Sequence, residues 1–394
     1  MYGRGGGGHK ASAKALSACL MEEHEMVDVG YLIESFLTGR QVPRTSGFDG
    51  DELYNWLMRR GWYVAAQVCG PVAKLIAWLQ RGKIERSLIR YFESRQPRAV
   101  VSFVPFFNAA FRSALLRACP DAHLFTVVTD FKSTSTHPWI DAWDETDARR
   151  HVIVAGTEAL QQQAEARGYP PGQILRTSGM VVHPSFSETP AGDGDADEPS
   201  NAAAGPYALI CFGGFAPTRR TLTLVRSMRQ SRPDLRLVVL CGGNENLRRQ
   251  LEALYEQAPQ RCVAAEGALA GEEVAQRMRK AAFVVGKPGP GLASEACACG
   301  VPFVTDSCSV MEQERSVLAH LEESGVGIVL PRLTSLPPDL EDRLRAARAA
   351  IAAQPRNAAA REVADELARA GSWHNLAASL RGVRSARKQQ PVSV

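Results

Sequence analysis

The chain has 394 residues, of which 45% are hydrophobic and 22% are charged, and its formal net charge at pH 7 is +4. This composition is typical of a globular protein of two to three domains, and it excludes a collagen, a coiled coil and a fully disordered chain. The small charge, with no long basic stripe, argues against nucleic acid as a partner. Nine cysteines are scattered without a C-x-x-C pair, which predicts reduced thiols rather than a disulfide framework or a zinc site.

No stretch of the sequence has the length of a membrane span. The longest apolar run, near Ala99–Phe111, contains a serine, a proline and an asparagine. It is shorter than the ~20 residues that cross a bilayer, and no secretory signal opens the chain. We therefore expect no transmembrane helix.

Short apolar runs alternate with helical segments along both halves of the chain. In the first half we predict strands at Ala99–Val104, Leu124–Asp130, His151–Ala155 and Ile174–Ser178, and helices at Leu53–Leu79, Ile84–Glu93, Asn108–Ala118 and Glu158–Arg167. In the second half we predict strands at Tyr207–Phe212, Leu235–Cys241, Cys262–Glu266, Phe283–Gly286 and Val301–Thr305, and helices at Arg219–Gln230, Glu245–Gln257, Glu272–Ala281 and Gly291–Ala298. Strands that alternate with helices predict parallel sheets covered on both faces.

A change of composition marks the boundary between the two halves. Glu188–Pro206 is rich in Gly, Pro, Asp and Ala and low in bulky apolar residues, which is typical of a linker. We predict an N-terminal domain over 1–187, a linker over 188–206, a C-terminal domain over 207–383 and a disordered tail over 384–394. Two such domains form a cleft, and their ligands bind outside the carboxyl ends of the strands.

The first glycine-rich segment, Gly3–Leu16, reads GRGGGGHKASAKAL and predicts a turn that runs into a helix. His9 falls at the start of this helix, where the positive end of the helix dipole disfavours an imidazolium. A neutral imidazole there has the form that a general base needs, although a flexible chain terminus is the simpler alternative. Because hardly any residues precede the glycines, we expect the first strand of the N-terminal domain to be missing and the turn to be poorly held.

Two further glycine pairs end neighbouring strands of the second half. CFGGF covers Cys211–Phe215, and CGGNENL covers Cys241–Leu247. Each alone is compatible with a plain turn between a strand and a helix. Two at equivalent positions favour a nucleotide site.

The strongest single signal is Gly286–Asp306, which reads GKPGPGLASEACACGVPFVTD. It predicts a strand, a tight turn and a helix whose free N–H groups can hold a diphosphate. Glu295 lies one turn into the helix, where it can accept both ribose hydroxyls or simply complement the helix dipole. The chain has neither a P-loop motif nor the G-x-G-x-x-G pattern with a following acidic residue, so a P-loop NTPase and a nicotinamide enzyme are disfavoured.

Seven segments, taken in chain order, resemble the family 28 glycosyltransferases, most closely the monogalactosyldiacylglycerol synthases and the bacterial diacylglycerol glucosyltransferases. They are GGGGHKASAKAL (Gly5–Leu16), YNWLMRRGW (Tyr54–Trp62), FTVVTDFKSTSTHPW (Phe125–Trp139), RTSGMVVHPSF (Arg176–Phe186), VVLCGGNENL (Val238–Leu247), KPGPGLASEA (Lys287–Ala296) and MEQE (Met311–Glu314). The resemblance covers nearly the whole chain apart from the linker and the tail.

This resemblance implies a GT-B fold, in which two Rossmann-like α/β domains with parallel sheets face each other across a cleft. The N-terminal domain would hold diacylglycerol and the C-terminal domain UDP-galactose or UDP-glucose. The chemistry would be inverting and metal-independent, with no cofactor besides the UDP-sugar substrate. Helix N-termini can stabilise a leaving diphosphate without a metal.

The resemblance also implies roles for individual residues. His9 would be the catalytic base, with Asp130 as the second catalytic candidate, and Pro105, His137 and Trp139 would line the acceptor side. Donor binding would fall to Gly213, Gly214, Gly242, Asn244, Lys287, Gly289, Gly291, Glu295, Gln313 and Glu314. Gly213 and Gly214 would approach the diphosphate, and Glu295 would bind ribose. Gln313 and Glu314 would bind the transferred sugar. The alternative for Asp130 is a cap at a strand end, and that for His137 is an imidazole packed in a loop.

A diacylglycerol acceptor stays in the bilayer, so the enzyme must reach a membrane. Aromatic and basic residues crowd the segment from Tyr54 to Arg90, a combination that suits an anionic membrane surface. The predicted contact residues are Trp56, Arg59, Arg60 and Trp62. An amphipathic core helix with a solvated basic face is the alternative. We expect a peripheral membrane protein, on the plastid envelope in a photosynthetic eukaryote and otherwise on the cytoplasmic face of a membrane.

Two other functions stay open at this point. One is N-acetylglucosaminyl transfer to a polyprenyl-linked acceptor, against which the HPW and YNW segments speak. The other is a non-catalytic nucleotide-sugar-binding protein, whose support is the missing first strand. The sequence does not separate galactose from glucose, because the two sugars differ at one hydroxyl.

Overall fold

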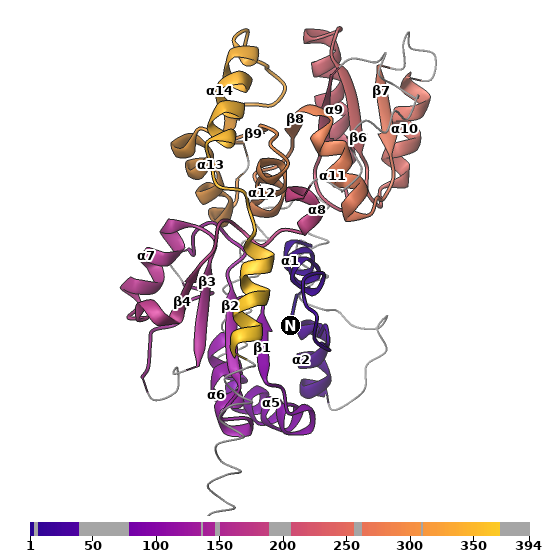
Figure 1. Cartoon of the computed structure of the whole chain (residues 1–394). Helices are drawn as coiled ribbons and strands as arrows, with labels where there is room; N and C mark the ends of the chain where they lie inside the picture. Colours follow the sequence, from indigo (N-terminus) through magenta and orange to yellow (C-terminus); the bar gives the residue numbers. More distant parts are fainter. Residues whose placement is uncertain are drawn as a thin grey trace, which may run out of the picture.

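A computed structural model of the protein describes residues 1–3, 7–38, 79–134, 137–145, 150–188, 206–255, 262–308 and 310–370, without the side chains of 34–38, 81 and 313. The chain forms two α/β lobes, each built on a parallel sheet (Figure 1). The GT-B fold expected from the sequence is therefore confirmed. No helix within the described ranges is long and apolar enough to cross a membrane.

The N-terminal sheet has four parallel strands in the order β1-β2-β3-β4. They are β1 (Ala99–Ser102), β2 (His123–Val127), β3 (His151–Ala155) and β4 (Ile174–Arg176). The helical segments of this half are α1 (Gly8–Ser17), α2 (Val29–Thr38), α5 (Arg81–Arg95), α6 (Asn108–Ala118), α7 (Glu158–Ala166), η1 (Pro171–Gln173) and α8 (Pro184–Ser187). Successive strand residues point to opposite faces, and both faces are buried: Leu124 packs with α5 and α6, whereas Phe125 packs with α1.

Met1 and Tyr2 add a short piece of parallel ladder beside β1. The amino group of Met1 donates to the Val101 carbonyl at 2.7 Å, and the Phe103 N–H donates to the Met1 carbonyl at 2.9 Å. On the other side, Tyr2 exchanges hydrogen bonds of 2.9 Å with Val27 and Val29. The described part of the chain contains no full strand before the glycines, but the expectation that the backbone there lacks a ladder was wrong. Hydrogen bonds from both sides therefore hold Met1 and Tyr2 in place.

The C-terminal sheet has six parallel strands in the order β10-β9-β8-β5-β6-β7. They are β5 (Tyr207–Cys211), β6 (Arg236–Leu240), β7 (Val263–Glu266), β8 (Ala281–Val285), β9 (Phe303–Asp306) and β10 (Gly327–Leu330). The helices are α9 (Thr218–Ser231), α10 (Glu245–Tyr255), α11 (Gly271–Arg279), α12 (Pro290–Ala298), α13 (Glu312–Ser324) and α14 (Leu340–Ala352). The strand order reverses between β5 and β8, and such a switch point is where open α/β sheets bind ligands.

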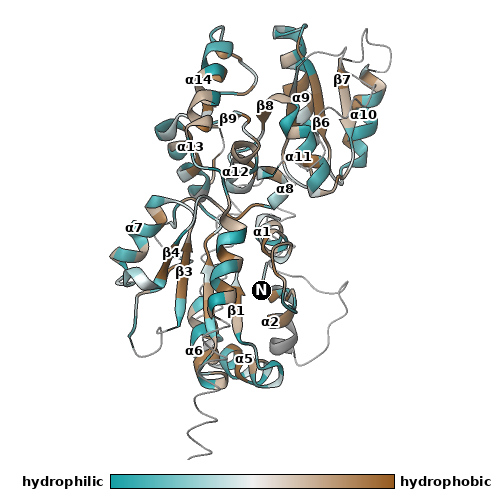
Figure 2. Ribbon diagram, in the orientation of Figure 1, coloured by the Kyte–Doolittle hydropathy of each residue, from teal (hydrophilic) through white to brown (hydrophobic). Residues whose placement is uncertain are grey.

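The core of this lobe lies on both faces of β5, which is buried along its whole length. Leu209 packs in one apolar cluster and Ile210 in the other. Figure 2 shows the same layering, with apolar strands inside and polar residues on the outer faces of the helices. This burial explains why the strands appear in the sequence as continuous apolar runs.

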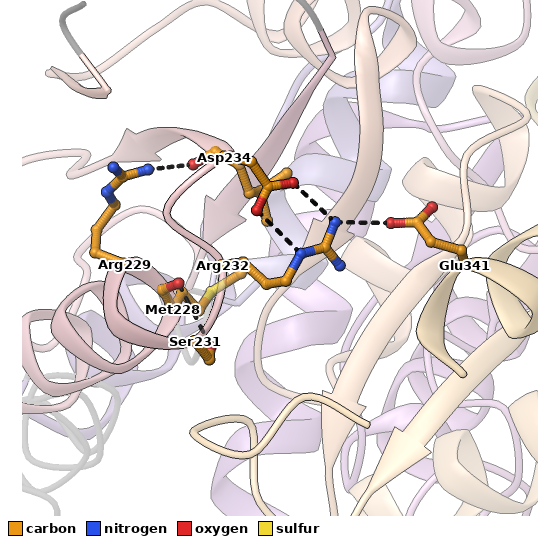
Figure 3. A network of polar contacts seen from close by, with 7 residues as sticks. Met228, Arg229, Ser231, Arg232, Asp234 and Glu341 are labelled. Atoms are coloured by element: carbon orange, nitrogen blue, oxygen red, sulfur yellow. Dashed lines mark hydrogen bonds and ion pairs between the residues drawn. The ribbon is translucent and has the colours of Figure 1, made fainter. Parts of the chain in front are cut away.

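An exposed ionic network joins α14 to the turn between α9 and β6, as Figure 3 shows. The guanidinium of Arg232 donates to Asp234 at 3.2 and 3.3 Å and to Glu341 at 3.1 Å. Pairs this exposed to solvent contribute little to stability. The network connects neighbouring elements of the C-terminal lobe.

Residues 359–370 form a helix that returns to the N-terminal lobe (yellow in Figure 1). Ala359, Ala360 and Val363 share an apolar cluster with Val127 of β2 and Val152 of β3. This helix, which the sequence placed within the domain 207–383, thus packs on the other sheet.

The nine predicted strands are all present, most of them one or two residues shorter than expected. Seven of the described elements were not predicted from the sequence, namely β10, α2, η1, α8, α13, α14 and the helix at 359–370. Most of the predicted helix at Leu53–Leu79, most of the linker and the predicted disordered tail lie outside the described residues. Eight cysteines fall within the described ranges, and all of them are free.

Candidate active site

The carboxyl ends of β5 and β8 meet at the switch point of the C-terminal sheet. A Cβ atom on Gly286 would lie 2.2 Å from the carbonyl oxygen of Cys211. Only glycine therefore allows the two strand ends to approach this closely. The two turns that follow, at Gly213–Gly214 and at Lys287–Gly289, come off adjacent strands.

The backbone of both turns is open on the side where side chains would stand. Gly213 has a φ of +89°, and a Cβ atom added to it or to Gly214 would have no neighbouring atom within 4 Å. Gly291 is equally open, and at Gly289 the nearest atom is Lys287 Cε at 3.9 Å. Because α12 begins here, the free N–H groups of its first turn can bind an anion such as a diphosphate.

Gly242 and Asn244, which we predicted to bind the donor, support the Gly213–Gly214 turn. A Cβ on Gly242 would lie 2.3 Å from the Gly214 carbonyl oxygen. The Asn244 amide donates to the Ala216 carbonyl at 2.7 Å, and its oxygen accepts from the Leu247 N–H at 3.1 Å as a helix cap. The buried side chain of Asn244 is thus occupied by internal hydrogen bonds, and its role in donor binding stays a prediction.

Glu295 lies in α12, half-buried, and its carboxylate has no hydrogen-bond or ion-pair partner in the part of the chain that the structure describes. Burial raises its pKa to about 7, because the charged form loses solvation. A carboxylate in this position can accept two hydroxyl hydrogen bonds from a ligand. The predicted ribose-binding role is compatible with this geometry and stays a prediction.

Glu314 and Lys287 form an ion pair beside the α12 turn. Glu314, only 5% exposed, lies 3.6 Å from the Lys287 ammonium, and it also accepts from the Met311 N–H at 3.1 Å. The second contact closes the first turn of α13. Gln313 lies in the same helical turn, but its side chain is outside the described residues.

His9 lies in the first turn of α1, after Gly7 with its φ of +78°. Its Nδ1 is 3.0 Å from the hydroxyl of Thr129, and its ring packs against Trp139 with the centroids 5.5 Å apart. Burial lowers the pKa of His9 to about 4. The imidazole is therefore neutral at pH 7, which is the form that can accept a proton.

Asp130 lies close to the same tryptophan. The Trp139 indole N–H donates to its carboxylate at 2.7 Å, so Asp130 is bound to a side chain and is not a plain strand-end cap. Burial raises its pKa to about 6, and the charge of Glu314 raises it further, against the lowering effect of the Trp139 hydrogen bond. The two catalytic candidates thus share one buried aromatic neighbour.

Asn108, which sequence reasoning missed, holds the acceptor-side loops together. It is 1% exposed, and its amide donates to the carbonyls of Val104 and Trp139, both at 3.2 Å. Its oxygen accepts from the Ser102 hydroxyl at 2.7 Å. The available signal was a polar residue interrupting the apolar run Ala99–Phe111.

Strained backbone occurs beside Pro105 and at His137, two of the predicted acceptor-side residues. Phe106, which follows the half-buried Pro105, has a φ of +72°, and its N–H donates to the Pro138 carbonyl at 2.7 Å. His137 has a φ of +45°, and its Nδ1 is buried without a hydrogen-bond partner within the described ranges. Such strain in residues other than glycine is concentrated at functional sites.

The two lobes bring these groups towards each other. Helix α1 contacts α12, beside α8 (Figure 1), and the Phe131 ring meets the His320 ring of α13 at 4.8 Å in a T-shaped arrangement. The predicted membrane-contact residues Trp56, Arg59, Arg60 and Trp62 lie outside the described residues.

No model of a known protein family matches the chain. A probable monogalactosyldiacylglycerol synthase 2, chloroplastic, of Oryza sativa subsp. indica is 23% identical over 346 residues, which cover 82% of this chain and 68% of the rice protein. The monogalactosyldiacylglycerol synthase of Spinacia oleracea is 24% identical and is covered to 61% of its length. A processive diacylglycerol beta-glucosyltransferase of Bacillus cereus (strain AH187) is 27% identical over 207 residues, 52% of this chain and 50% of that protein.

The chain is similar to family 28 glycosyltransferases. The sequence relatives support the resemblance at the level of this family. Among solved structures, a Listeria monocytogenes protein described as a UDP-N-acetylglucosamine 2-epimerase aligns with a TM-score of 0.52 over 75% of this chain and 79% of its own, at 17% identity. That likeness concerns the fold alone.

Proposed function

We propose that the protein is an inverting glycosyltransferase that moves galactose or glucose from a UDP-sugar to diacylglycerol. The observation that carries the proposal is the juxtaposition of two groups from different lobes. In the N-terminal lobe, Trp139 donates to the carboxylate of Asp130 and packs against the ring of His9. In the C-terminal lobe, Glu314, whose charge contributes to the raised pKa of Asp130, pairs with Lys287 in the turn before α12. The similarity to glycolipid glycosyltransferases supports the choice of reaction.

The donor would lie at the switch point of the C-terminal sheet. Its diphosphate would accept from the first-turn N–H groups of α12 and approach the open Gly213–Gly214 turn, with Lys287 as the nearby cation. Glu295 would accept the ribose hydroxyls, while Gln313 and Glu314 would bind hydroxyls of the hexose. These groups can stabilise the leaving diphosphate without a metal ion.

The acceptor hydroxyl would attack the anomeric carbon from the side of the N-terminal lobe. As the new C–O bond forms, the hydroxyl proton passes to the neutral His9. The bond from the anomeric carbon to the UDP oxygen breaks, and the diphosphate leaves with the electron pair. Attack opposite the leaving group inverts the configuration. Asp130 is the second candidate base, because its raised pKa makes it a better proton acceptor than an exposed aspartate.

A peripheral place on the membrane follows from the acceptor, which stays in the bilayer. On α5, the exposed side chains of Arg86 and Arg90 stand four residues apart on one face. They extend the basic and aromatic segment that begins at Tyr54, and cations next to aromatics bind anionic lipid surfaces.

Transfer of labelled sugar tests this proposal. The protein is incubated with diacylglycerol vesicles and, in separate reactions, radiolabelled UDP-galactose, UDP-glucose or UDP-N-acetylglucosamine, and the lipids are separated by chromatography. We expect label in a hexosyl-diacylglycerol. Label only in a polyprenyl-linked acceptor supplied in parallel would favour the first alternative, and UDP binding without any transfer would favour the non-catalytic one.

A further inference from the structure

We infer that Thr129 is a positioning residue that fixes the tautomer of His9, so that the proton sits on Nδ1 and Nε2 is free to act as the base. This inference rests on the proposed role of His9. Thr129 lies in the segment Phe125–Trp139, but neither the sequence analysis nor the proposed reaction gave it a role.

The contact is between residues 120 positions apart in the chain. Thr129 follows β2, and the preceding residue, Val128, donates its N–H to the Val154 carbonyl of β3 at 3.3 Å. The threonine hydroxyl is therefore carried by backbone that the sheet holds. From this position it lies 3.0 Å from His9 Nδ1.

Trp139 restricts the imidazole from another direction. Its indole is 1% exposed, and the Asn108 amide holds its carbonyl at 3.2 Å. The ring of His9 packs against this fixed indole. A ring flip that exchanged Nδ1 for Nε2 would have to break the Thr129 hydrogen bond and disturb this packing.

The chemistry then determines which nitrogen must carry the proton. A neutral imidazole has one N–H and one lone pair. Because Nδ1 is engaged by Thr129, the nitrogen left for the acceptor hydroxyl is Nε2. It can take a proton only if Nδ1 carries the N–H and donates it to the Thr129 oxygen. In the opposite tautomer the threonine would donate, and Nε2 would be blocked by its own proton.

A hydroxyl performs this task without adding a charge beside the base. The adjacent carboxylate of Asp130 accepts from Trp139 at 2.7 Å instead. Two consecutive residues thus serve different groups: Thr129 orients His9, and Asp130 stays available as a separate charge.

The test compares Thr129→Val, which replaces the hydroxyl by a methyl group of similar size, with Thr129→Ser, which keeps it. Nitrogen-15 NMR of labelled histidine reports the tautomer of each ring, and the His9→Asn variant identifies the His9 signals by their loss. We expect the Nδ1–H tautomer in the wild type and in Thr129→Ser, and a shift towards Nε2–H in Thr129→Val. We also expect kcat to fall about 10–100-fold in Thr129→Val, part of the usual general-base contribution, with near wild-type kcat in Thr129→Ser and unchanged UDP affinity in both.

A wild-type His9 with its proton on Nε2 would overturn the inference. So would a Thr129→Val variant that keeps both the Nδ1–H tautomer and its kcat. Thr129→Ala is the second variant if the valine perturbs folding. Because the NMR measurement needs no turnover, a wild-type protein that shows the expected tautomers but transfers no sugar would contradict the proposed function and leave the positioning of His9 supported.

Discussion

The carboxylates of Asp130 and Glu314 belong to different lobes, and the charge of Glu314 raises the pKa of Asp130. Glu314 is itself paired with Lys287 at 3.6 Å. The pKa of Asp130 therefore depends on the charge of the ion pair between Glu314 and Lys287. Adding or removing a charge near Glu314 changes the proton affinity of Asp130.

Replacing Glu314 by Gln should lower the pKa of Asp130 from its value of about 6. The amide oxygen of Gln can still accept from the Met311 N–H, so the first turn of α13 should be kept. Carbon-13 NMR titration of labelled aspartate measures the shift, with Glu341→Gln, in the remote Arg232 network, as the matched control. An Asp130 titration that is the same in both variants would mean that the two carboxylates are not coupled.

Glu295→Ala should weaken UDP binding by roughly 1–3 kcal/mol, the cost of leaving hydroxyl groups of a buried ligand unpaired. Calorimetry measures the affinity, and Glu341→Ala should leave it unchanged. Because the pKa of Glu295 is about 7, its carboxylate is protonated on going to lower pH. Wild-type affinity should therefore rise between pH 6 and 8 more steeply than that of Glu295→Gln. Equal UDP affinity in the wild type and Glu295→Ala would remove Glu295 from the donor site.

His151 should make the N-terminal lobe sensitive to acid. It is 1% exposed, and its ring nitrogens contact the Thr126 hydroxyl at 2.8 Å and the Tyr169 hydroxyl at 3.0 Å. Burial, together with the positive charge of Arg112, lowers its pKa to about 3. The unfolded chain takes up this proton near pH 6.5, so the folded state loses stability as the pH falls from there towards 3.

This group alone can change the free energy of unfolding by at most about 1.4 kcal/mol per pH unit. Denaturant unfolding from pH 7 to 4 measures it, and the slope should be smaller in His151→Gln, which does not titrate. Identical slopes in the two proteins would show that His151 is not held neutral by the fold.

The membrane prediction concerns the segment Tyr54–Arg90. Sedimentation with vesicles of anionic lipid should be strong at low salt and weaker as salt screens the charges. Changing Trp56, Arg59, Arg60 and Trp62 together should abolish it, whereas Arg345→Ala, an exposed arginine of α14, should not matter. Undiminished sedimentation of the fourfold variant would favour the core-helix alternative.

The sequence was sufficient for nine of the ten strands in the described residues and for the glycine-rich turns, because buried parallel strands and glycine-rich turns are local patterns. Partners far apart in the chain were not predictable in this way. Nothing local to Asn244 indicates that Ala216 will occupy its amide, and nothing near His9 points to Thr129. The helix at 359–370 has an ordinary alanine-rich sequence that does not reveal on which sheet it packs.

The shortest elements were also missed for a physical reason. Met1 and Tyr2 form no recognisable strand by themselves, and their place is fixed only by Val101, Phe103 and the backbone near Val27. Gly242 was singled out as a special position, but the contact that requires a glycine there was not predicted: its missing side chain makes room for Gly214.

The most direct test of the proposed reaction is the initial rate of labelled hexose transfer to diacylglycerol by the wild type and by His9→Ala, each measured with EDTA present. We predict transfer by the wild type that EDTA does not reduce. We also predict a kcat lower by about 10²–10⁴-fold in His9→Ala, with UDP affinity retained. Wild-type activity that survives His9→Ala unchanged, or that EDTA abolishes, would contradict the proposed mechanism.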